Sequence, residues 1–187
     1  MGGPGSGRPR WQGRKDTVED CLILDMNMFL RNQLVRDGFT KAGRLTWSNP
    51  ATGETVSMCR YVVDTLDLDE PSLCLFYTLT RNGEAVSYSV RLATTTPNYG
   101  GIRWWFLCPL APNGNLCDRR VGKLYLPPGA KYFGCRRCYD LTYTSCQEHD
   151  KRVDFLTKNP EAFLAAMKSP RTKDLHLALK AAFRLGL

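Results

Sequence analysis

Four cysteines in the second half of the chain have spacings that suit a metal ion. Cys135 and Cys138 are separated by two residues, whereas Cys108 and Cys117 are separated by eight. A Cys-x-x-Cys turn presents two thiolates from one knuckle, and a tetrahedral zinc ion takes its second pair from elsewhere in the fold. The start of the chain does not resemble a secretion signal, so clustered cysteines favour metal ligation over disulfides. We therefore predict one zinc ion bound by Cys108, Cys117, Cys135 and Cys138.

A second ligand set stays open, because Cys146 and His149 follow the second pair at short spacing. A site built from Cys135, Cys138, Cys146 and His149 would leave the first cysteine pair without a role. In the four-cysteine site the thiolates fill the tetrahedron and leave no position for water. The Zn²⁺ is therefore expected to be structural and to contribute to folding.

Residue patterns common in enzymes are missing from the chain. There is no His-Glu-x-x-His run and no glycine-rich phosphate loop, and the zinc deaminase pattern before Pro-Cys-x-x-Cys is absent. The only two histidines are His149 and His176, and a serine or cysteine triad would need one of them. We expect a protein that is not an enzyme and has no small-molecule substrate; an enzyme is the third alternative.

Between the two cysteine pairs, the sequence reads as a strand, a turn and a strand at residues 123–126, 127–129 and 131–133. The phrase Tyr132-Phe133-Gly134-Cys135-Arg136-Arg137-Cys138-Tyr139 then resembles the second knuckle of zinc ribbons in transcription factors, topoisomerase tails and transposases. The chain departs from the usual pattern in its first knuckle, which must be an expanded loop. The resemblance implies a zinc-ribbon module, which we place at residues 107–145.

Positive charge is concentrated in the N-terminal arm and around the cysteines. Residues 1–15 carry four basic residues and no acidic one, and residues 103–137 carry seven basic residues and one acidic one. Residues 16–102 have a net charge of −4. Basic segments interleaved with aromatic residues favour a polyanionic partner, because the cations neutralise phosphates and the rings stack on bases. Charge that serves solubility alone is the alternative.

The predicted partner is nucleic acid, either DNA or RNA. Arg136 and Arg137 lie inside the second knuckle, where the thiolates take the inner positions and the arginines must point outward. Gly7-Arg8-Pro9-Arg10 resembles the core of an AT-hook, an extended segment that lies in a narrow minor groove, although a flexible arm without a partner is the alternative. The predicted nucleic-acid-binding residues are Arg8, Arg10, Arg14, Lys15, Arg119, Arg120, Lys123, Lys131, Arg136 and Arg137.

Residues 17–37 are predicted to form one helix. Thr17 and Asp20 approximate a capping box at its start, and Gly38 is a candidate for the residue after its end. Apolar residues recur through the segment at helical spacing, namely at Leu22, Met26, Phe29, Leu30 and Leu34. A short helix-turn-helix-like pair, with Asp25 as the cap of the second helix, is the alternative.

The signals between residues 39 and 106 switch to strands. Apolar and β-branched runs at 45–47, 55–63, 73–80, 85–92 and 102–107 are separated by turn residues at 49–53, 81–84 and 97–101. The Asn82-Gly83 turn between two such runs is typical of a hairpin. We predict an antiparallel sheet of four to six strands, in which Trp104 and Trp105 point to opposite faces.

The chain returns to helix near its end. Asn159-Pro160-Glu161 has the composition of a helix start, and Ser169-Pro170 repeats it before a helix at 173–185. Four apolar residues share one face of that last helix, a pattern that normally packs on a core: Leu175, Leu179, Ala182 and Phe183. Basic residues lie mostly on the other face, either solvated or against phosphates: Lys173, Lys180 and Arg184.

Together these patterns predict an α+β protein with an N-terminal helix, an antiparallel β-sheet core, a zinc-ribbon module and C-terminal helices. Its parts are a flexible basic arm (1–15), a helix-plus-sheet domain (16–106), the ribbon (107–145) and a C-terminal helical segment (146–187). No apolar run approaches the roughly 20 residues that span a bilayer. We therefore expect a soluble, cytoplasmic protein without a membrane partner.

The layout as a whole, including the run Arg-Trp-Trp-Phe-Leu-Cys-Pro before the first knuckle, resembles bacterial or phage proteins of mobile-element type to which no activity is assigned. That resemblance implies a context and no mechanism. We expect a non-enzymatic, regulatory zinc-ribbon protein that binds nucleic acid through its arm and ribbon. The alternative is an adaptor or inhibitor that docks on a bacterial nucleoprotein complex and has a protein partner there.

Overall fold

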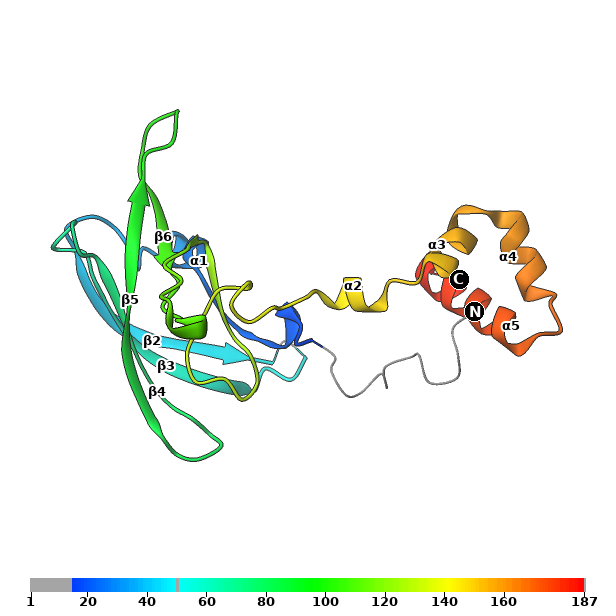
Figure 1. Ribbon diagram of the computed structural model, residues 1–187, viewed down its shortest axis with the longest axis horizontal. Helices are drawn as coiled ribbons and strands as arrows, with labels where there is room; N and C mark the ends of the chain where they lie inside the picture. Colours follow the sequence, from blue (N-terminus) through cyan, green and yellow to red (C-terminus); the bar gives the residue numbers. More distant parts are fainter. Residues whose placement is uncertain (1–14, 50, 187) are drawn as a thin grey trace. The chain divides into compact units, whose positions relative to one another are not determined.

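A computed structural model describes residues 15–49 and 51–186 of the chain (Figure 1). These residues form two compact units that divide between Thr142 and Tyr143. The first unit combines strands with the helix α1 (Met26–Arg31), and the second is helical. This mixture of helix and antiparallel sheet confirms the α+β class. The predicted arm lies outside the described residues except for Lys15, and the limits of a separate ribbon at 107–145 stay a prediction.

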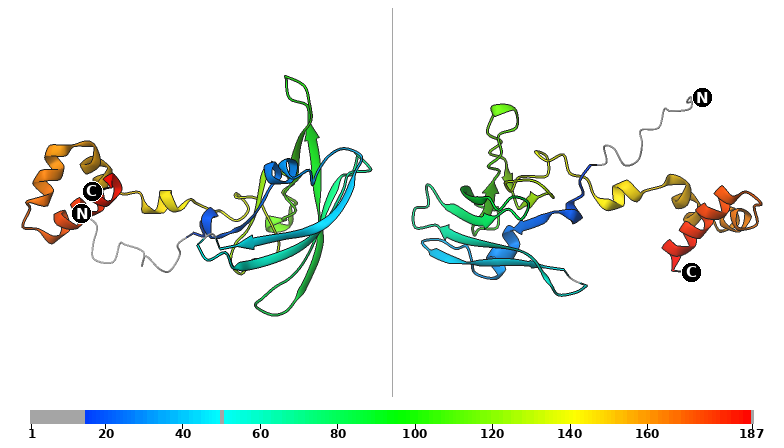
Figure 2. Two further views of the ribbon diagram at one scale, coloured as in Figure 1. Left: turned by 180° about the vertical axis from the view of Figure 1, so that it is seen from behind. Right: turned by 90° about the horizontal axis from the view of Figure 1, so that it is seen from below.

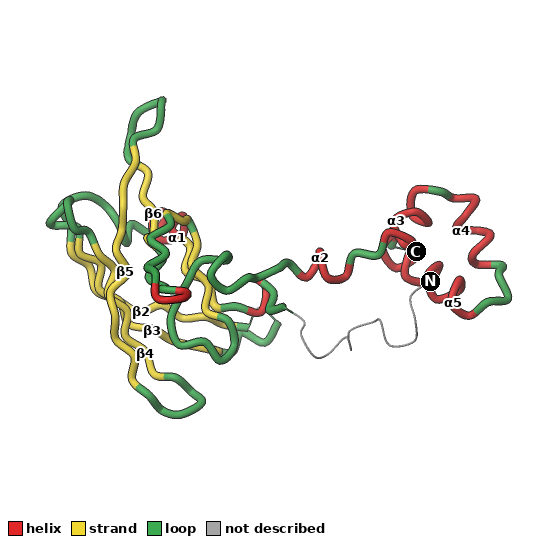
Figure 3. The backbone as a smooth tube through the Cα atoms, in the orientation of Figure 1, coloured by secondary structure: helices red, strands yellow, loops and turns green. Residues whose placement is uncertain are grey.

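The first unit is built on a six-stranded antiparallel sheet in which neighbours in space are neighbours in sequence (Figures 1 and 3). Its strands are β2 (Thr40–Ser48), β3 (Thr55–Asp64), β4 (Ser72–Thr78), β5 (Ala85–Thr95), β6 (Arg103–Leu107) and β7 (Arg120–Val121). Each predicted run from residue 45 to residue 107 lies within or across one of these strands. Local hairpins explain this success, because turn residues and alternating apolar positions specify them without distant contacts.

One face of the sheet carries the core of the first unit. Phe29 on α1 has no exposed surface and packs edge-to-face on Tyr61 of β3 and Phe106 of β6, with ring centroids 5.9 and 5.7 Å apart. In Figures 1 and 2, α1 and the loops that carry the cysteines lie on this side of the sheet. Trp104 of β6 is buried on the core face, whereas Trp105 is half-buried on the other, as strand alternation predicts.

The prediction of one helix over residues 17–37 is wrong. A 3-10 turn, η1 (Val18–Asp20), leads into β1 (Leu22–Asp25), and α1 follows. The Asp25 carboxylate caps α1 by accepting a hydrogen bond from the Asn27 backbone N–H at 2.9 Å. Strand β1 pairs with β8 (Lys123–Leu126), nearly a hundred residues away, in a separate two-stranded sheet. This distant partner converts an apolar run that fits either a helix or a strand into a strand.

The predicted strand–turn–strand unit between the cysteine pairs is only partly correct. The first strand is β8, and the turn at 127–129 forms with a hydrogen bond from Ala130 N–H to the Pro127 carbonyl at 3.0 Å. The second strand at 131–133 is wrong, because these residues form no strand, and the chain pairs with β8 only at the next residue, through one bridge between Tyr125 and Gly134. The other edge of β8 is occupied by β1, so the first unit builds the cysteine loops into its own core.

The second unit is helical, and its last three helices pack on one another as a small bundle (Figure 1). Its helices are α2 (Thr144–Glu148), α3 (Lys151–Lys158), α4 (Pro160–Met167) and α5 (Thr172–Leu185). Both predicted C-terminal helices are confirmed as α4 and α5, but the apolar face predicted for α5 does not pack. Ala178 and Ala181 are buried, whereas Leu179 and Phe183 are 53% and 87% exposed. The small alanines let α5 lie close to α3 and α4. Among the described residues no helix is long and apolar enough to cross a membrane.

Candidate metal centre

Cys108 and Cys117 lie in the loop that joins β6 to β7. Cys108 directly follows β6, and its backbone N–H donates to the Arg119 carbonyl at 3.1 Å. The Cys117 backbone N–H donates to the Leu110 carbonyl at 2.8 Å and so closes the loop. Between them Asn113 and Gly114 both have positive φ angles, of 58° and 82°, and reverse the chain. The expanded first knuckle is therefore a loop that is closed by backbone hydrogen bonds and brings Cys117 back toward Cys108.

Cys135 and Cys138 form the second knuckle. The Cys138 backbone N–H points at the Cys135 sulfur, with a nitrogen–sulfur distance of 3.4 Å, and the Cys135 backbone N–H points at the Cys108 sulfur at 3.2 Å. Gly134 precedes the knuckle and exchanges two backbone hydrogen bonds with Tyr125, at 2.8 and 2.9 Å. Strand β8 thus holds the second pair of cysteines against the first.

The four thiols come together in a group of the size that one metal ion needs. Their sulfur atoms all lie within 4.8 Å of one another. Cys108 and Cys138 are 3.8 Å apart, Cys117 and Cys135 3.9 Å, and Cys135 and Cys138 3.5 Å. Four sulfurs at roughly 2.3 Å from a tetrahedral ion would lie about 3.8 Å apart. All four cysteines are free rather than disulfide-bonded, so the cluster fits one metal ion.

Burial opposes the ionisation of all four thiols at once. Burial raises the pKa of the Cys108 thiol to about 11 and is also the main reason for the raised pKa of Cys138. Burial acts in the same direction on Cys135, but hydrogen bonds from the Cys138 backbone and neighbouring thiols lower the pKa of Cys135 to about 7. Four adjacent thiolates therefore need a cation to offset their mutual repulsion.

Arg119 supplies part of that positive charge. Its Nη1 lies 3.6 Å from the Cys135 sulfur and 3.8 Å from the Cys117 sulfur. A guanidinium that donates to metal-bound thiolates orients them and reduces their negative charge. Arg119 is one of the residues predicted to bind nucleic acid, and its contact with the thiols was not predicted. Its position two residues after Cys117, on the returning arm of a loop, was the available signal.

Three of the other predicted basic residues form ion pairs with acidic side chains. Lys15 pairs with Asp140, Lys123 with Asp25 at 3.0 Å, and Lys131 with Glu84. Three further arginines are exposed around the cysteine loops: Arg120, Arg136 and Arg137. The outward position predicted for the two knuckle arginines is thus confirmed. Arg8, Arg10 and Arg14 lie outside the described residues.

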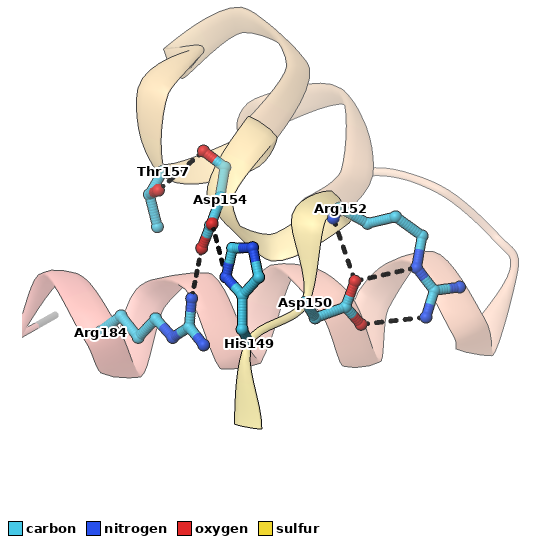
Figure 4. A network of polar contacts seen from close by, with 6 residues as sticks. All are labelled: His149, Asp150, Arg152, Asp154, Thr157 and Arg184. Carbon is cyan, nitrogen blue, oxygen red and sulfur yellow. Dashed lines mark hydrogen bonds and ion pairs between the residues drawn. The ribbon is translucent and has the colours of Figure 1, made fainter. Parts of the chain in front are cut away.

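Cys146 and His149 do not join the cysteine cluster among the described residues. Both belong to the second unit, where Cys146 is exposed on α2. The His149 imidazole lies 3.0 Å from the Asp154 carboxylate, which also accepts from Arg184 of α5 at 2.5 Å (Figure 4). These contacts connect α5 to α3 and give His149 a structural role inside its own bundle.

Comparison with family models, curated proteins and solved structures finds no match for this chain. The function must therefore be argued from the geometry of the cysteine cluster and of the charged surfaces.

Proposed function

We propose that this protein is a non-enzymatic nucleic-acid-binding module whose first unit is stabilised by one structural zinc ion. The convergence of Cys108, Cys117, Cys135 and Cys138 carries the proposal. Four thiolate ligands are typical of structural zinc and leave no open position for a reacting water. Cys108 and Cys135 are buried in the core and Cys117 and Cys138 are partly buried against it, which favours a role in folding over exchange with substrate.

The nucleic-acid part of the proposal is supported by the arginines around the cluster. Arg119 ends the first loop and Arg120 begins β7, Arg136 and Arg137 come from the second knuckle, and Arg119 reaches the Cys135 sulfur. The two segments are therefore adjacent. The acidic residues nearest them in sequence, Asp118 and Asp140, are engaged by Arg91 and Lys15. A surface of this kind suits phosphates, which arginine binds through a fork of donors.

Metal analysis of purified protein tests the zinc site. We expect one zinc per chain in the wild type and almost none in Cys135→Ser. Cys59→Ser is the matched control, because Cys59 is buried like Cys135 but lies outside the cluster. Cys146→Ser should retain zinc fully. Loss of zinc in Cys146→Ser together with retention in Cys117→Ser would refute the four-cysteine assignment in favour of the set that includes His149.

Fluorescence anisotropy with a labelled duplex tests the arginine surface. Each lost phosphate contact should reduce the slope of log K against log salt by about 0.9, so Arg120→Ala with Arg137→Ala should reduce it by about 1.8. Arg31→Ala removes the same kind of charge from an exposed position on α1 and should leave the slope unchanged. Equal slopes for wild type and the double variant would refute this surface.

A protein partner is the second candidate, and one observation favours it. Leu175, Leu179 and Phe183 recur every four residues on α5 and are 38%, 53% and 87% exposed. Contiguous exposed apolar side chains are typical of interaction surfaces. If the protein binds no nucleic acid alone but binds a bacterial nucleoprotein complex, the adaptor function would be favoured.

A further inference from the structure

The outer face of the six-stranded sheet carries a row of side chains that crosses four strands. Arg44 on β2 lies opposite Arg60 on β3, Arg60 lies opposite Phe76 on β4, and Phe76 lies opposite Ser87 on β5. Directly opposite residues point to the same side of a sheet, with Cβ atoms about 5 Å apart. On each of these strands an adjacent residue is buried in the core, so the row lies on the face opposite the core.

A groove of about 580 Å³ lies over this row. The described residues that line it include both arginines and no acidic residue. Phe76 is half-buried and Met58, from the same lining, is 48% exposed. The floor of the groove therefore offers the apolar surface of Phe76 and Met58 beside the positive charges of the two arginines.

The two arginines have no counter-ion among the described residues. Some other basic side chains of the first unit do: Arg91 pairs with Asp118, Lys123 with Asp25, and Lys131 with Glu84. Within the part of the chain that the structure describes, the guanidinium groups of Arg44 and Arg60 form no ion pair with a carboxylate. Like charges directly opposite each other on neighbouring strands destabilise a sheet. An anion bound over the pair would remove this repulsion.

We propose that this groove binds single-stranded nucleic acid, with backbone phosphates on Arg44 and Arg60 and an unstacked base on Phe76. Arginine contacts phosphate through several donors, and aromatic faces on a sheet stack bases. A duplex keeps its bases stacked on one another, so only a single strand offers a free base face to a ring set in a sheet. The row spans three strand spacings, about 14 Å, which leaves room for more than one nucleotide.

This surface differs from the arginines around the cysteine cluster. Cys108 and Cys135 belong to the core on the opposite face of the sheet, so the groove and the knuckle can be altered separately. The inference shares its class of ligand with the proposed function, but it stands on other residues.

The test uses the full chain and labelled oligonucleotides of about 12 nucleotides, a length within the range of single-strand binding sites. Oligo-dT, oligo-rU and a duplex of equal length are titrated by anisotropy at several salt concentrations. Phe76→Leu keeps an apolar side chain and removes the ring, and it should weaken single-strand binding roughly 5- to 150-fold without changing the salt slope. Arg44→Ala with Arg60→Ala should reduce the slope by about 1.4, because each contact to a single strand contributes about 0.7.

Arg31→Ala is the charge control, and Arg137→Ala reports on the knuckle; neither should weaken single-strand binding as Phe76→Leu does. Circular dichroism and the unfolding midpoint show whether each variant is folded. Photocrosslinking of an oligonucleotide with 5-iodouridine should label the tryptic peptide that contains Phe76. Wild-type affinity in folded Phe76→Leu, an equal loss of duplex and single-strand binding in that variant, or equal competition by an acidic peptide of matched charge would overturn the proposal. Loss of single-strand binding in Arg137→Ala alone would overturn it and leave the knuckle surface standing.

Discussion

Replacement of Gly134 by alanine should weaken the cysteine cluster without touching a ligand. A Cβ atom at residue 134 would lie 2.7 Å from Leu110 Cγ and 2.8 Å from Tyr139 Cε2, both closer than real Cβ contacts allow. The φ angle of Gly134 is not positive, so the added methyl group acts through contact alone.

The neighbours of Gly134 have little freedom to move. The hydroxyl of Tyr139 donates to the Tyr132 carbonyl, and the Leu110 carbonyl accepts from the Cys117 backbone N–H. A shift of Leu110 therefore moves the first cysteine pair, while a shift of the Gly134 backbone moves Cys135. Overpacking of this kind costs about 1–3 kcal/mol. If the metal-bound form carries this cost, the zinc dissociation constant should rise roughly 5- to 150-fold.

Competition with a chromophoric chelator measures that constant, and urea unfolding of the zinc-loaded protein measures the free energy of unfolding. Gly122→Ala is the matched control, since Gly122 also lies between the two cysteine pairs, has no positive φ and has nothing within 4 Å of an added Cβ. We expect Gly122→Ala to behave as the wild type. Equal zinc affinity and equal unfolding midpoints for the two variants would refute the close packing of Leu110 and Tyr139 on the second knuckle.

Three further predictions concern stability. Phe183→Ser should change the free energy of unfolding by less than about 0.5 kcal/mol because the ring is 87% exposed, whereas Ala181→Leu on the buried face should cost about 1–3 kcal/mol; the reverse order in thermal unfolding would contradict the packing of α5. Trp47→Phe should cost about 1–2 kcal/mol in urea unfolding, because the indole N–H donates to a β1 carbonyl at 3.0 Å that would lose its partner; an unchanged midpoint would argue against that contact. Hydrogen bonds from Arg152 lower the pKa of Asp150 from 3.8 to about 2, so its contribution to stability is present above about pH 4 and is lost as the pH falls toward 2. In Asp150→Asn, the helical circular dichroism signal should therefore change less between about pH 4 and pH 2 than in the wild type. An acid transition identical to the wild type would count against this contribution of Asp150.

The strands of the large sheet could be predicted because their signals are local. Alternating apolar positions and turn residues recur within a few residues along the chain, and each strand pairs with its neighbour in sequence. The helix predicted at 17–37 failed for the opposite reason. Residues 22–25 satisfy a helical pattern, but their backbone groups pair with β8, and no local signal announces a partner that far away.

The last helix shows a similar limit. Leu175, Leu179 and Phe183 have helical spacing, and the sequence pattern favours them as the packing face. In the bundle, Ala178 and Ala181 take that place because small side chains let α5 lie close to α3 and α4. Periodicity identifies a helix and its faces, but the choice of buried face depends on which neighbours are available.

The ligands of the cysteine cluster could be predicted from the sequence, but the contacts that hold them in place could not. Residue type and spacing were enough to select Cys108, Cys117, Cys135 and Cys138, because thiol pairs at such intervals have few other uses in a chain of this kind. The loop closure at Leu110, the approach of Arg119 and the bridge from Gly134 to Tyr125 depend on β6 and β8 lying beside the knuckles. The same holds for the row from Arg44 to Phe76, whose members lie sixteen positions apart in the chain at each step and become neighbours only through the register of the sheet.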